Sequence, residues 1–198
     1  MLVFLNRCSE VQLSRFMDLL RPNRFAASLT DVDVEDLRNK GFESVILDLD
    51  NTVLPWKDSV VPKPVVEWVE WAKSKGLKLC IVSNTHNPKR LIKIADDLGI
   101  SCVHRALKPG RGGFKKALRT LDCDPERTVV VGDQIFTDVL GGNLAGMYTI
   151  LVKPMHRREF VGTRLSRLFE YLILQLIARQ SRPGTNSETT QSQTQDTK

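Results

Sequence analysis

Two aspartates stand two residues apart in the stretch ILDLDNTVLP, directly after an apolar run: Asp48 and Asp50. Side chains two positions apart on an extended chain point the same way, so these carboxylates should project together. Like charges held close repel each other, and the pKa of one group rises unless a cation lies between them. The pair is therefore either a solvated turn or a site that binds a cation and performs chemistry.

Two more aspartates follow a later apolar run, in the stretch TVVVGDQIFTDV. These are Asp133 and Asp138, and with the first pair they would form a cluster of hard oxygen ligands. Mg²⁺ suits such a cluster, because it takes a few carboxylates and keeps water and substrate phosphate as its other ligands. No His or Cys stands near these positions in the sequence, which argues against zinc.

Groups that can bind an anion follow two other apolar runs. Ser83 and Asn84 offer a hydroxyl and an amide, and Lys108 opens a glycine-rich basic loop, KPGRGGFKK. Such a loop is either an ordinary basic turn or backbone that cradles an anion before a helix. An anion held between lysine, hydroxyl and Mg²⁺ indicates phosphoryl transfer, where positioning and charge neutralisation supply most of the rate. A carboxylate can then act as the nucleophile and form an aspartyl phosphate.

Alternating apolar and amphipathic segments must position these side chains. The apolar runs predict five strands, at 44–47, 77–83, 100–104, 128–132 and 147–152. Between them the pattern predicts helices, at 64–76, 88–98, 113–121 and 137–144. This alternation predicts an α/β fold with a doubly wound parallel sheet.

In such a sheet, ligands lie at the carboxyl ends of the strands. Each of four side chains lies at or just beyond a predicted strand end: Asp48, Ser83, Lys108 and Asp133. They are spread over much of the chain, yet the fold should bring them to one edge. The sequence therefore predicts a single site there.

Four segments resemble the motifs of the haloacid dehalogenase-like (HAD) phosphatases over roughly residues 20 to 155: DLDNT, the serine after the second strand, KPGRGGFKKAL and VVGDQIFTDVLGGNLAGMYTILV. The phrases LLRPNRF, LDLDNTVLPW and YTILVKP resemble the YqeG subgroup of subclass IIIA in particular. Relatives of that subgroup in mitochondria and plastids dephosphorylate phosphatidylglycerophosphate. The resemblance implies a HAD-like, Rossmann-like fold and a Mg²⁺-dependent phosphomonoester hydrolase, most specifically a phosphatidylglycerophosphate phosphatase in phospholipid biosynthesis.

The resemblance also implies roles for the matching residues. Asp48 would be the nucleophile, and Asp50 would protonate the leaving alkoxide and then activate the hydrolytic water. Thr52 would help to fix Asp50 at the phosphate-binding end of the site. The phosphoryl group would be bound by Ser83, Asn84 and Lys108. Mg²⁺ would be held by Asp48, the backbone carbonyl of Asp50 and Asp133, while Asp138 would orient the lysine or a metal-bound water.

Many HAD enzymes carry a cap domain, inserted after the first motif or between the second and third. The gap from Asp50 to Ser83 holds only a turn, a hairpin-like segment and one helix, and the gap from Ser83 to Lys108 holds one helix and one strand. The enzyme is therefore predicted to be capless, with an open site that reaches phosphates on large objects. Trp56, just past the first motif, could meet an apolar part of the substrate.

The chain divides into four predicted parts: an N-terminal helical segment at 1–30, the phosphatase core at 31–155, a basic amphipathic helix at 156–180 and a disordered tail at 181–198. The formal net charge is +6, and 151–182 holds seven basic but only two acidic residues. Such a segment prefers an anionic partner. The helix either covers the sheet or lies on an anionic membrane, and the sequence leaves both open.

Composition bounds the remaining expectations. The 198 residues are 41% apolar and 26% charged, which is ordinary for a globular protein. The four cysteines are scattered without a CxxC, and no secretory signal is recognisable, so we expect a cytoplasmic protein, peripheral on the inner membrane leaflet if the helix binds lipid. The expected partner is a phosphorylated substrate, most specifically a lipid, and no specific nucleic acid. Two alternatives stay open: a phosphatase of a nucleic-acid end, phosphoprotein or small ester, or a non-enzymatic phosphate- or RNA-binding module.

Overall fold

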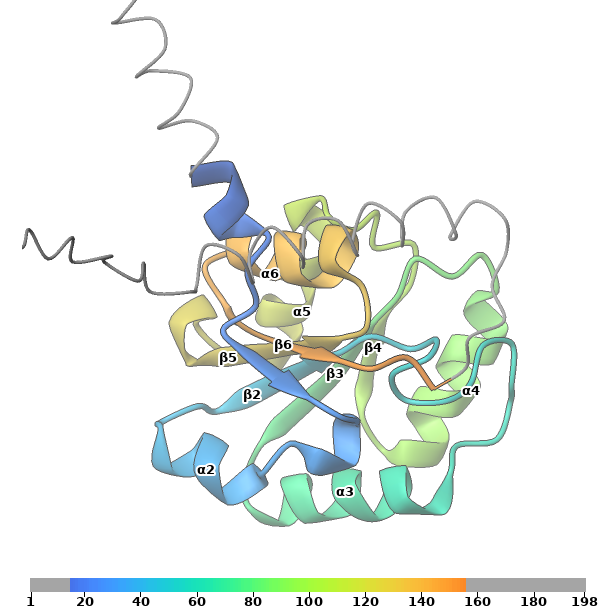
Figure 1. Ribbon diagram of the computed structural model, residues 1–198. Coiled ribbons are helices and arrows are strands. Elements are labelled where there is room, and N and C mark those ends of the chain that lie inside the picture. Colours follow the sequence, from blue (N-terminus) through green and yellow to red (C-terminus); the bar gives the residue numbers. More distant parts are fainter. Residues whose placement is uncertain (1–14, 156–198) are drawn as a thin grey trace, which may run out of the picture.

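Six parallel strands form the centre of the protein (Figure 1). The computed structural model describes residues 15–155, in which the strand order is β1-β6-β5-β2-β3-β4. The strands are β1 (Arg24–Ala26), β2 (Ser44–Leu47), β3 (Lys78–Val82), β4 (Ser101–Val103), β5 (Thr128–Gly132) and β6 (Tyr148–Val152). Every adjacent pair is parallel, so the doubly wound α/β fold expected from the sequence is confirmed.

Helices cover both faces of this sheet (Figure 1). They are α2 (Val34–Asn39), α3 (Lys63–Ser74), α4 (Pro88–Leu98), α5 (Arg111–Leu121) and α6 (Leu140–Leu144). Successive strand residues point to opposite faces. Val45 and Leu47 of β2 accordingly join the core cluster that includes Trp68 of α3, whereas Ile46 joins the cluster that includes Phe114 of α5. The sheet is thus covered on both faces. Polar functional side chains can therefore reach solvent at the ends of the strands.

Local sequence signals fix the ends of α4. Asn87 is the N-cap residue, and its side-chain oxygen accepts a hydrogen bond of 3.1 Å from the backbone N–H of Arg90. Pro88 occupies the first turn, where its missing N–H costs nothing. Gly99 closes the helix with φ of +61°, a conformation that glycine adopts without strain. These caps place the first turn of α4 beside the carboxyl end of β3.

Two elements near the N-terminal side of the sheet, strand β1 and helix α2, were not predicted from the sequence. Strand β1 pairs with β6 at the edge of the sheet, and Asn23 just before it exchanges hydrogen bonds with Thr149, at 2.9 Å from N to O and 2.8 Å from Oδ1 to N. Three residues with partly exposed side chains give no strand pattern of their own. The sheet therefore extends N-terminal to residue 31, the predicted start of the core.

The helix expected over 137–144 begins earlier and in two parts. A π-helical turn, Ile135–Val139, leads directly into α6. Gly141 and Gly142, which weaken a helix by propensity, are required by packing: a Cβ on Gly141 would lie 2.4 Å from Phe114 Cε2, and one on Gly142 would lie 2.6 Å from Thr149 Cγ2. These glycines let α6 lie close to α5 and β6.

No domain is inserted between the strands in the described part of the chain. Residues 48–62 form the connection from β2 to α3, and only α4 and β4 separate β3 from the loop before α5. The capless architecture expected from the sequence is what the described residues contain. The predicted basic helix at 156–180 and the tail at 181–198 lie outside them, as do residues 1–14. Within 15–155, no helix has the length and apolar character needed to cross a bilayer.

Candidate active site

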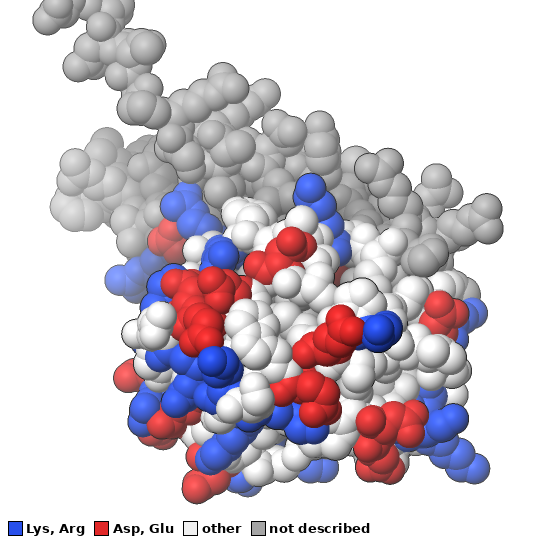
Figure 2. Space-filling model, turned by 90° about the horizontal axis from the view of Figure 1, so that it is seen from below, with Lys and Arg blue, Asp and Glu red and all other residues white. Residues whose placement is uncertain are grey.

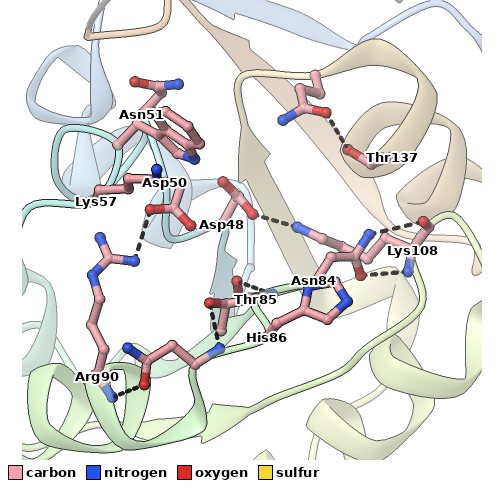
Figure 3. A pocket seen from close by; sticks show the side chains of 14 residues that line it. Asp48, Asp50, Asn51, Lys57, Asn84, Thr85, His86, Arg90, Lys108 and Thr137 are labelled. Atoms are coloured by element: carbon pink, nitrogen blue, oxygen red, sulfur yellow. Dashed lines mark hydrogen bonds and ion pairs between the residues drawn. The ribbon is translucent and has the colours of Figure 1, made fainter. Parts of the chain in front are cut away.

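A cavity of about 690 Å³ opens at the carboxyl ends of the strands (Figure 3). Its lining includes five of the side chains that the sequence singled out: Asp48, Asp50, Ser83, Asn84 and Lys108. Asp48 directly follows β2, and its N–H continues the ladder by donating to Val131 O at 2.9 Å. Ser83 follows β3 in the same way and donates to Val103 O at 3.0 Å. The parallel sheet therefore delivers both residues to one edge.

Lys108 lies between two buried carboxylates. Its Nζ donates to Asp48 Oδ1 at 2.5 Å and to Asp138 Oδ1 at 2.6 Å. The lysine side chain is 3% exposed and that of Asp138 is 2% exposed. Asp138 is fixed in turn, because its Oδ2 accepts a hydrogen bond of 3.2 Å from the N–H of Gln134. The ammonium group is thus aimed at Asp48 from a rigid position.

Burial and mutual attraction shift the pKa values of this group. Burial raises the pKa of Asp48 to about 7, with Lys108 opposing the rise and Asp138 adding to it. Burial alone would lower the pKa of Lys108, but attraction to Asp138 and Asp48 outweighs it, so that pKa lies above its ordinary value. The lysine is therefore a permanent cation at the floor of the cavity, where a phosphoryl group would need one.

Three carboxylates come together where a divalent ion could bind. Asp48, Asp133 and Asp138 each offer an oxygen within 4.8 Å of the other two. Hard oxygen donors of this kind fit Mg²⁺. Asp48 Oδ2 accepts no hydrogen bond within the described residues, whereas both oxygens of Asp138 already accept one. Among the backbone hydrogen bonds of residues 15–155, none uses the carbonyl of Asp50, so that oxygen also remains available.

Gly132 makes this arrangement sterically possible. It is the last residue of β5 and precedes Asp133. A Cβ at this position would lie 2.3 Å from Cγ of Asp138. Only glycine therefore lets Asp138 approach the strand closely enough to reach Lys108.

Asp50 has a partner that no sequence motif indicates. Arg90, in the first turn of α4, donates from Nη1 to Asp50 Oδ1 at 2.8 Å and from Nε to Asp58 O at 2.6 Å. Within the described residues, Asp50 Oδ2 accepts no hydrogen bond, so this second oxygen is available to a substrate. The sequence could have indicated this residue, because Arg90 lies in the first turn of a helix that follows a strand. In a parallel sheet such a helix begins at the carboxyl ends of the strands, where the site lies.

Asn84 is engaged differently from the expectation. Its Oδ1 accepts from Lys108 N at 2.8 Å, and its Nδ2 donates to Lys108 O at 3.0 Å. The amide therefore clamps the backbone of the lysine, although it lines the cavity. Ser83 Oγ accepts from Thr85 N at 3.1 Å, which leaves its hydroxyl hydrogen free to turn toward a ligand.

Thr52 does not line the cavity. Its side chain is fully buried, and its Oγ1 has no hydrogen-bond partner within residues 15–155. The neighbouring Asn51, with φ of +67°, lines the cavity instead. Of these two neighbours, Asn51 therefore faces the cavity and Thr52 lies in the core.

The family assignment agrees with this geometry. The family of haloacid dehalogenase-like hydrolases matches residues 14–146 of the chain. The chain therefore belongs to the haloacid dehalogenase-like hydrolases.

Named relatives narrow the class to phosphatases. The chain is 37% identical, over 158 residues, to the probable phosphatase YqeG of Bacillus subtilis, covering 80% of this chain and 91% of that protein. It is 27% identical to the chloroplastic/mitochondrial phosphatidylglycerophosphate phosphatase 1 of Arabidopsis thaliana, covering 84% of this chain and 51% of that protein. It is 28% identical to the mitochondrial phosphatidylglycerophosphatase GEP4 of Saccharomyces cerevisiae, covering 68% of this chain and 78% of that protein. The chain spans about half the length of the Arabidopsis relative. The protein is a HAD-family phosphatase of the YqeG type, and its substrate is phosphorylated.

Proposed function

We propose that the protein hydrolyses the terminal phosphate of phosphatidylglycerophosphate through an aspartyl phosphate on Asp48. The observation that carries the reaction is the position of Asp48 at the floor of an open cavity, with one oxygen held by Lys108 and the other accepting no hydrogen bond within 15–155. The substrate is inferred from the two relatives named as phosphatases of this lipid, which match 84% and 68% of the chain.

In the first step, Asp48 Oδ2 attacks phosphorus, and the bond from phosphorus to the leaving oxygen breaks. The alkoxide takes the proton of Asp50, whose Oδ2 is available while Oδ1 is held by Arg90. Lys108 and Ser83, both in the cavity lining, bind the phosphoryl oxygens as negative charge redistributes over them. Alcohol is released, and the phosphoryl group stays on Asp48.

In the second step, water attacks the phosphorus of the acyl phosphate and loses its proton to Asp50. The bond from phosphorus to the Asp48 oxygen breaks, which returns the carboxylate and releases inorganic phosphate. Asp138 and Asn84 act indirectly, through Lys108. Asp138 holds its side chain, and Asn84 holds its backbone. The same carboxyl group therefore serves as acid and then as base.

Mg²⁺ is the cofactor that the carboxylates fit best. Asp48, Asp133 and the carbonyl of Asp50 would hold it, with Asp138 beside them. When bound, Mg²⁺ offsets the repulsion between carboxylates and phosphate and orients the phosphoryl group. Asp48 can then remain ionised in spite of its burial.

Exposed apolar and basic side chains around the cavity support a lipid substrate. We define the cavity rim as residues 55–62, 84–90 and 104–111, in which four basic residues are exposed (Lys57, Lys89, Arg105 and Arg111) beside one acidic residue, Asp58. Three apolar side chains of the rim are exposed: Trp56 at 37%, Val60 at 79% and Leu107 at 80%. A surface that is both cationic and apolar fits the interface of an anionic membrane.

The opposite kind of surface lies on the side of α2 and α3, where acidic and basic side chains are intermixed (Figure 2). Ion pairs such as Lys40–Asp36 and Lys75–Glu35 hold these charges. We therefore propose that the cavity rim faces the inner leaflet of the cytoplasmic membrane, with the enzyme peripheral on it. The rim would deliver the lipid head group directly to Asp48.

Phosphate release tests the substrate. The full-length protein is assayed with phosphatidylglycerophosphate, a phosphoprotein, a 5′-phosphorylated oligonucleotide and glycerol 3-phosphate, each with Mg²⁺ and with EDTA. The proposal predicts the highest kcat/KM for the lipid and loss of turnover in EDTA. A higher kcat/KM for another ester would show that this ester is the preferred substrate, while the assignment as a phosphatase would stand. Absence of turnover with all four would favour a phosphate-binding module.

A further inference from the structure

We propose that Arg90 and Lys57 form a second anion subsite, which binds a negatively charged group carried by the leaving alcohol. In phosphatidylglycerophosphate that group is the phosphodiester, so the inference rests on the proposed function and deepens it. The subsite would let the enzyme select bis-anionic substrates over simple phosphate monoesters.

Arg90 has hydrogen-bonding capacity that the protein leaves unused. Its Nε donates to Asp58 O at 2.6 Å and its Nη1 donates to Asp50 Oδ1 at 2.8 Å, so the guanidinium is held in a fixed orientation. Its Nη2 is buried and has no hydrogen-bond partner within residues 15–155. A buried charged donor without an acceptor costs free energy, which an anionic ligand would recover. Arg90 also lines the cavity, so such a ligand would bind beside it.

The position of Arg90 matches the direction in which the leaving group departs. In Figure 3, Arg90, Lys57 and Asp50 lie on one side of Asp48, and Lys108 enters from the other side. The leaving oxygen must come within hydrogen-bond reach of Asp50 to take its proton. Whatever else the leaving alcohol carries is therefore brought toward Arg90, while the transferred phosphoryl group stays with Lys108.

Lys57 adds a second positive charge at the mouth of the cavity. Its side chain is exposed and lines the cavity, and its Nζ lies over the ring of Trp56, 4.3 Å from the centroid. Within the described residues it forms no ion pair with a carboxylate. Its charge can therefore be directed to a ligand, and the aromatic contact keeps it at the cavity mouth.

The balance of charge on this side of the cavity favours a second anion. Arg90 is paired with Asp50, and Lys57 forms no ion pair within the described residues. Two cations therefore meet one carboxylate there. A second anion on the substrate supplies the missing counter-charge, whereas a simple monoester does not. Bis-anionic substrates should therefore gain in kcat/KM.

Two water-soluble substrates isolate this effect. Deacylated phosphatidylglycerophosphate carries the phosphodiester on its leaving alcohol, and glycerol 3-phosphate lacks it. The ratio of their kcat/KM values is measured for the full-length protein and for Arg90→Gln, Arg90→Lys, Lys57→Gln and the control Lys93→Gln, an exposed lysine one turn further along α4. Because Arg90 also touches Asp50, its replacement slows both substrates, and the ratio removes that common loss.

The parent should prefer the bis-anionic substrate. Arg90→Gln should lower the ratio about tenfold, the loss expected for one charge-assisted hydrogen bond, and Arg90→Lys should restore part of it. Lys57→Gln should lower it about threefold, since this exposed cation is partly screened. Lys93→Gln should leave it unchanged. A ratio that stays constant in both Arg90→Gln and Lys57→Gln overturns the subsite; if Arg90→Gln fails to fold, the exposed Lys57 decides alone.

The outcomes separate this inference from the proposed function. If the intact lipid is hydrolysed but the ratio of the two kcat/KM values is the same in all variants, the proposed function is supported and the anion subsite is contradicted. If the ratio of kcat/KM values depends on Arg90 but the intact lipid is not hydrolysed, the anion subsite is supported. The substrate of the enzyme would then be a soluble bis-anionic ester.

Discussion

Lys108 Nζ lies 2.5 Å from Asp48 Oδ1, although the two residues are 60 positions apart in the chain. The contact joins the loop before α5 to the carboxyl end of β2, and Asp138 holds the same ammonium group from a third segment. A buried cation needs a carboxylate beside it, and two buried carboxylates need a cation between them. This triad therefore links the stability of the fold to the geometry of the site.

Removal of the lysine should reveal that link. In Lys108→Met, two buried carboxylates lose their cation, and we expect the free energy of unfolding to fall by about 3–5 kcal/mol at neutral pH. Urea denaturation followed by circular dichroism measures the change. Adding Asp138→Asn to Lys108→Met should recover part of the loss, because one of the uncompensated charges is gone. Purely additive effects of the two substitutions would contradict the triad.

The stability of the metal-free protein should depend on pH through Asp48. Burial raises the pKa of this carboxyl from 3.8 to about 7. A carboxyl with a higher pKa in the folded chain favours folding while it is protonated, so its contribution is present below pH 3.8 and is lost as the pH rises to about 7. In EDTA, Asp48→Asn should therefore gain stability relative to the parent over this range. If the unfolding free energies of the parent and of Asp48→Asn change with pH in the same way, the raised pKa of Asp48 in the folded protein is contradicted.

Gly132→Ala tests the close approach of Asp138 to β5. The added Cβ would lie 2.3 Å from Asp138 Cγ, so we expect a loss of about 1–3 kcal/mol in unfolding free energy and a fall in turnover as the carboxylate leaves Lys108. Gly112→Ala is the matched control, because its added Cβ would meet nothing within 4 Å. In a helix that change should be neutral or stabilising by up to about 1 kcal/mol. If Gly132→Ala and Gly112→Ala change stability and turnover equally, the close approach of Asp138 to Gly132 is not what requires glycine there.

Membrane contact through the cavity rim predicts a difference between two tryptophans. Trp56 on the rim is 37% exposed, and Trp71 on α3 is 39% exposed. Cosedimentation of the full-length protein with phosphatidylglycerol vesicles should weaken about tenfold in Trp56→Ala, since burial of this side chain in lipid is lost. Trp71→Ala should bind as the parent does. Equal binding by all three proteins would show that the rim does not contact the membrane.

The parts of the fold that sequence predicts are those that local signals determine. Strands β2, β3, β5 and β6 are largely buried apolar runs, and the caps of α4 are set by Asn87 and Gly99 themselves. Strand β1 was missed because its order comes from pairing with β6 and not from its own three residues. The same distinction holds in the site. Strand ends predicted which loops meet at the cavity, but the Arg90–Asp50 ion pair joins residues 40 positions apart, and no local pattern records it.

Two side chains show a further limit of motif reading. Phosphate binding by Asn84 stays a prediction, and the motif did not indicate that both ends of this amide are bonded to the backbone of Lys108. Thr52 was expected to help fix Asp50 and to bind phosphate, but its side chain is fully buried and does not line the cavity. A motif specifies which residues occur, whereas the direction of each side chain depends on backbone conformation and on partners from other elements.

Chemical trapping of the phosphorylated residue tests the central claim most directly. The full-length protein is mixed with phosphatidylglycerophosphate and Mg²⁺, quenched with sodium borohydride, which reduces an acyl phosphate to an alcohol, and digested for mass spectrometry. We expect substrate-dependent reduction at Asp48 and none in Asp48→Asn, which should fold but release no phosphate. Reduction at a different carboxylate, or phosphate release by Asp48→Asn at the parent rate, would contradict Asp48 as the nucleophile.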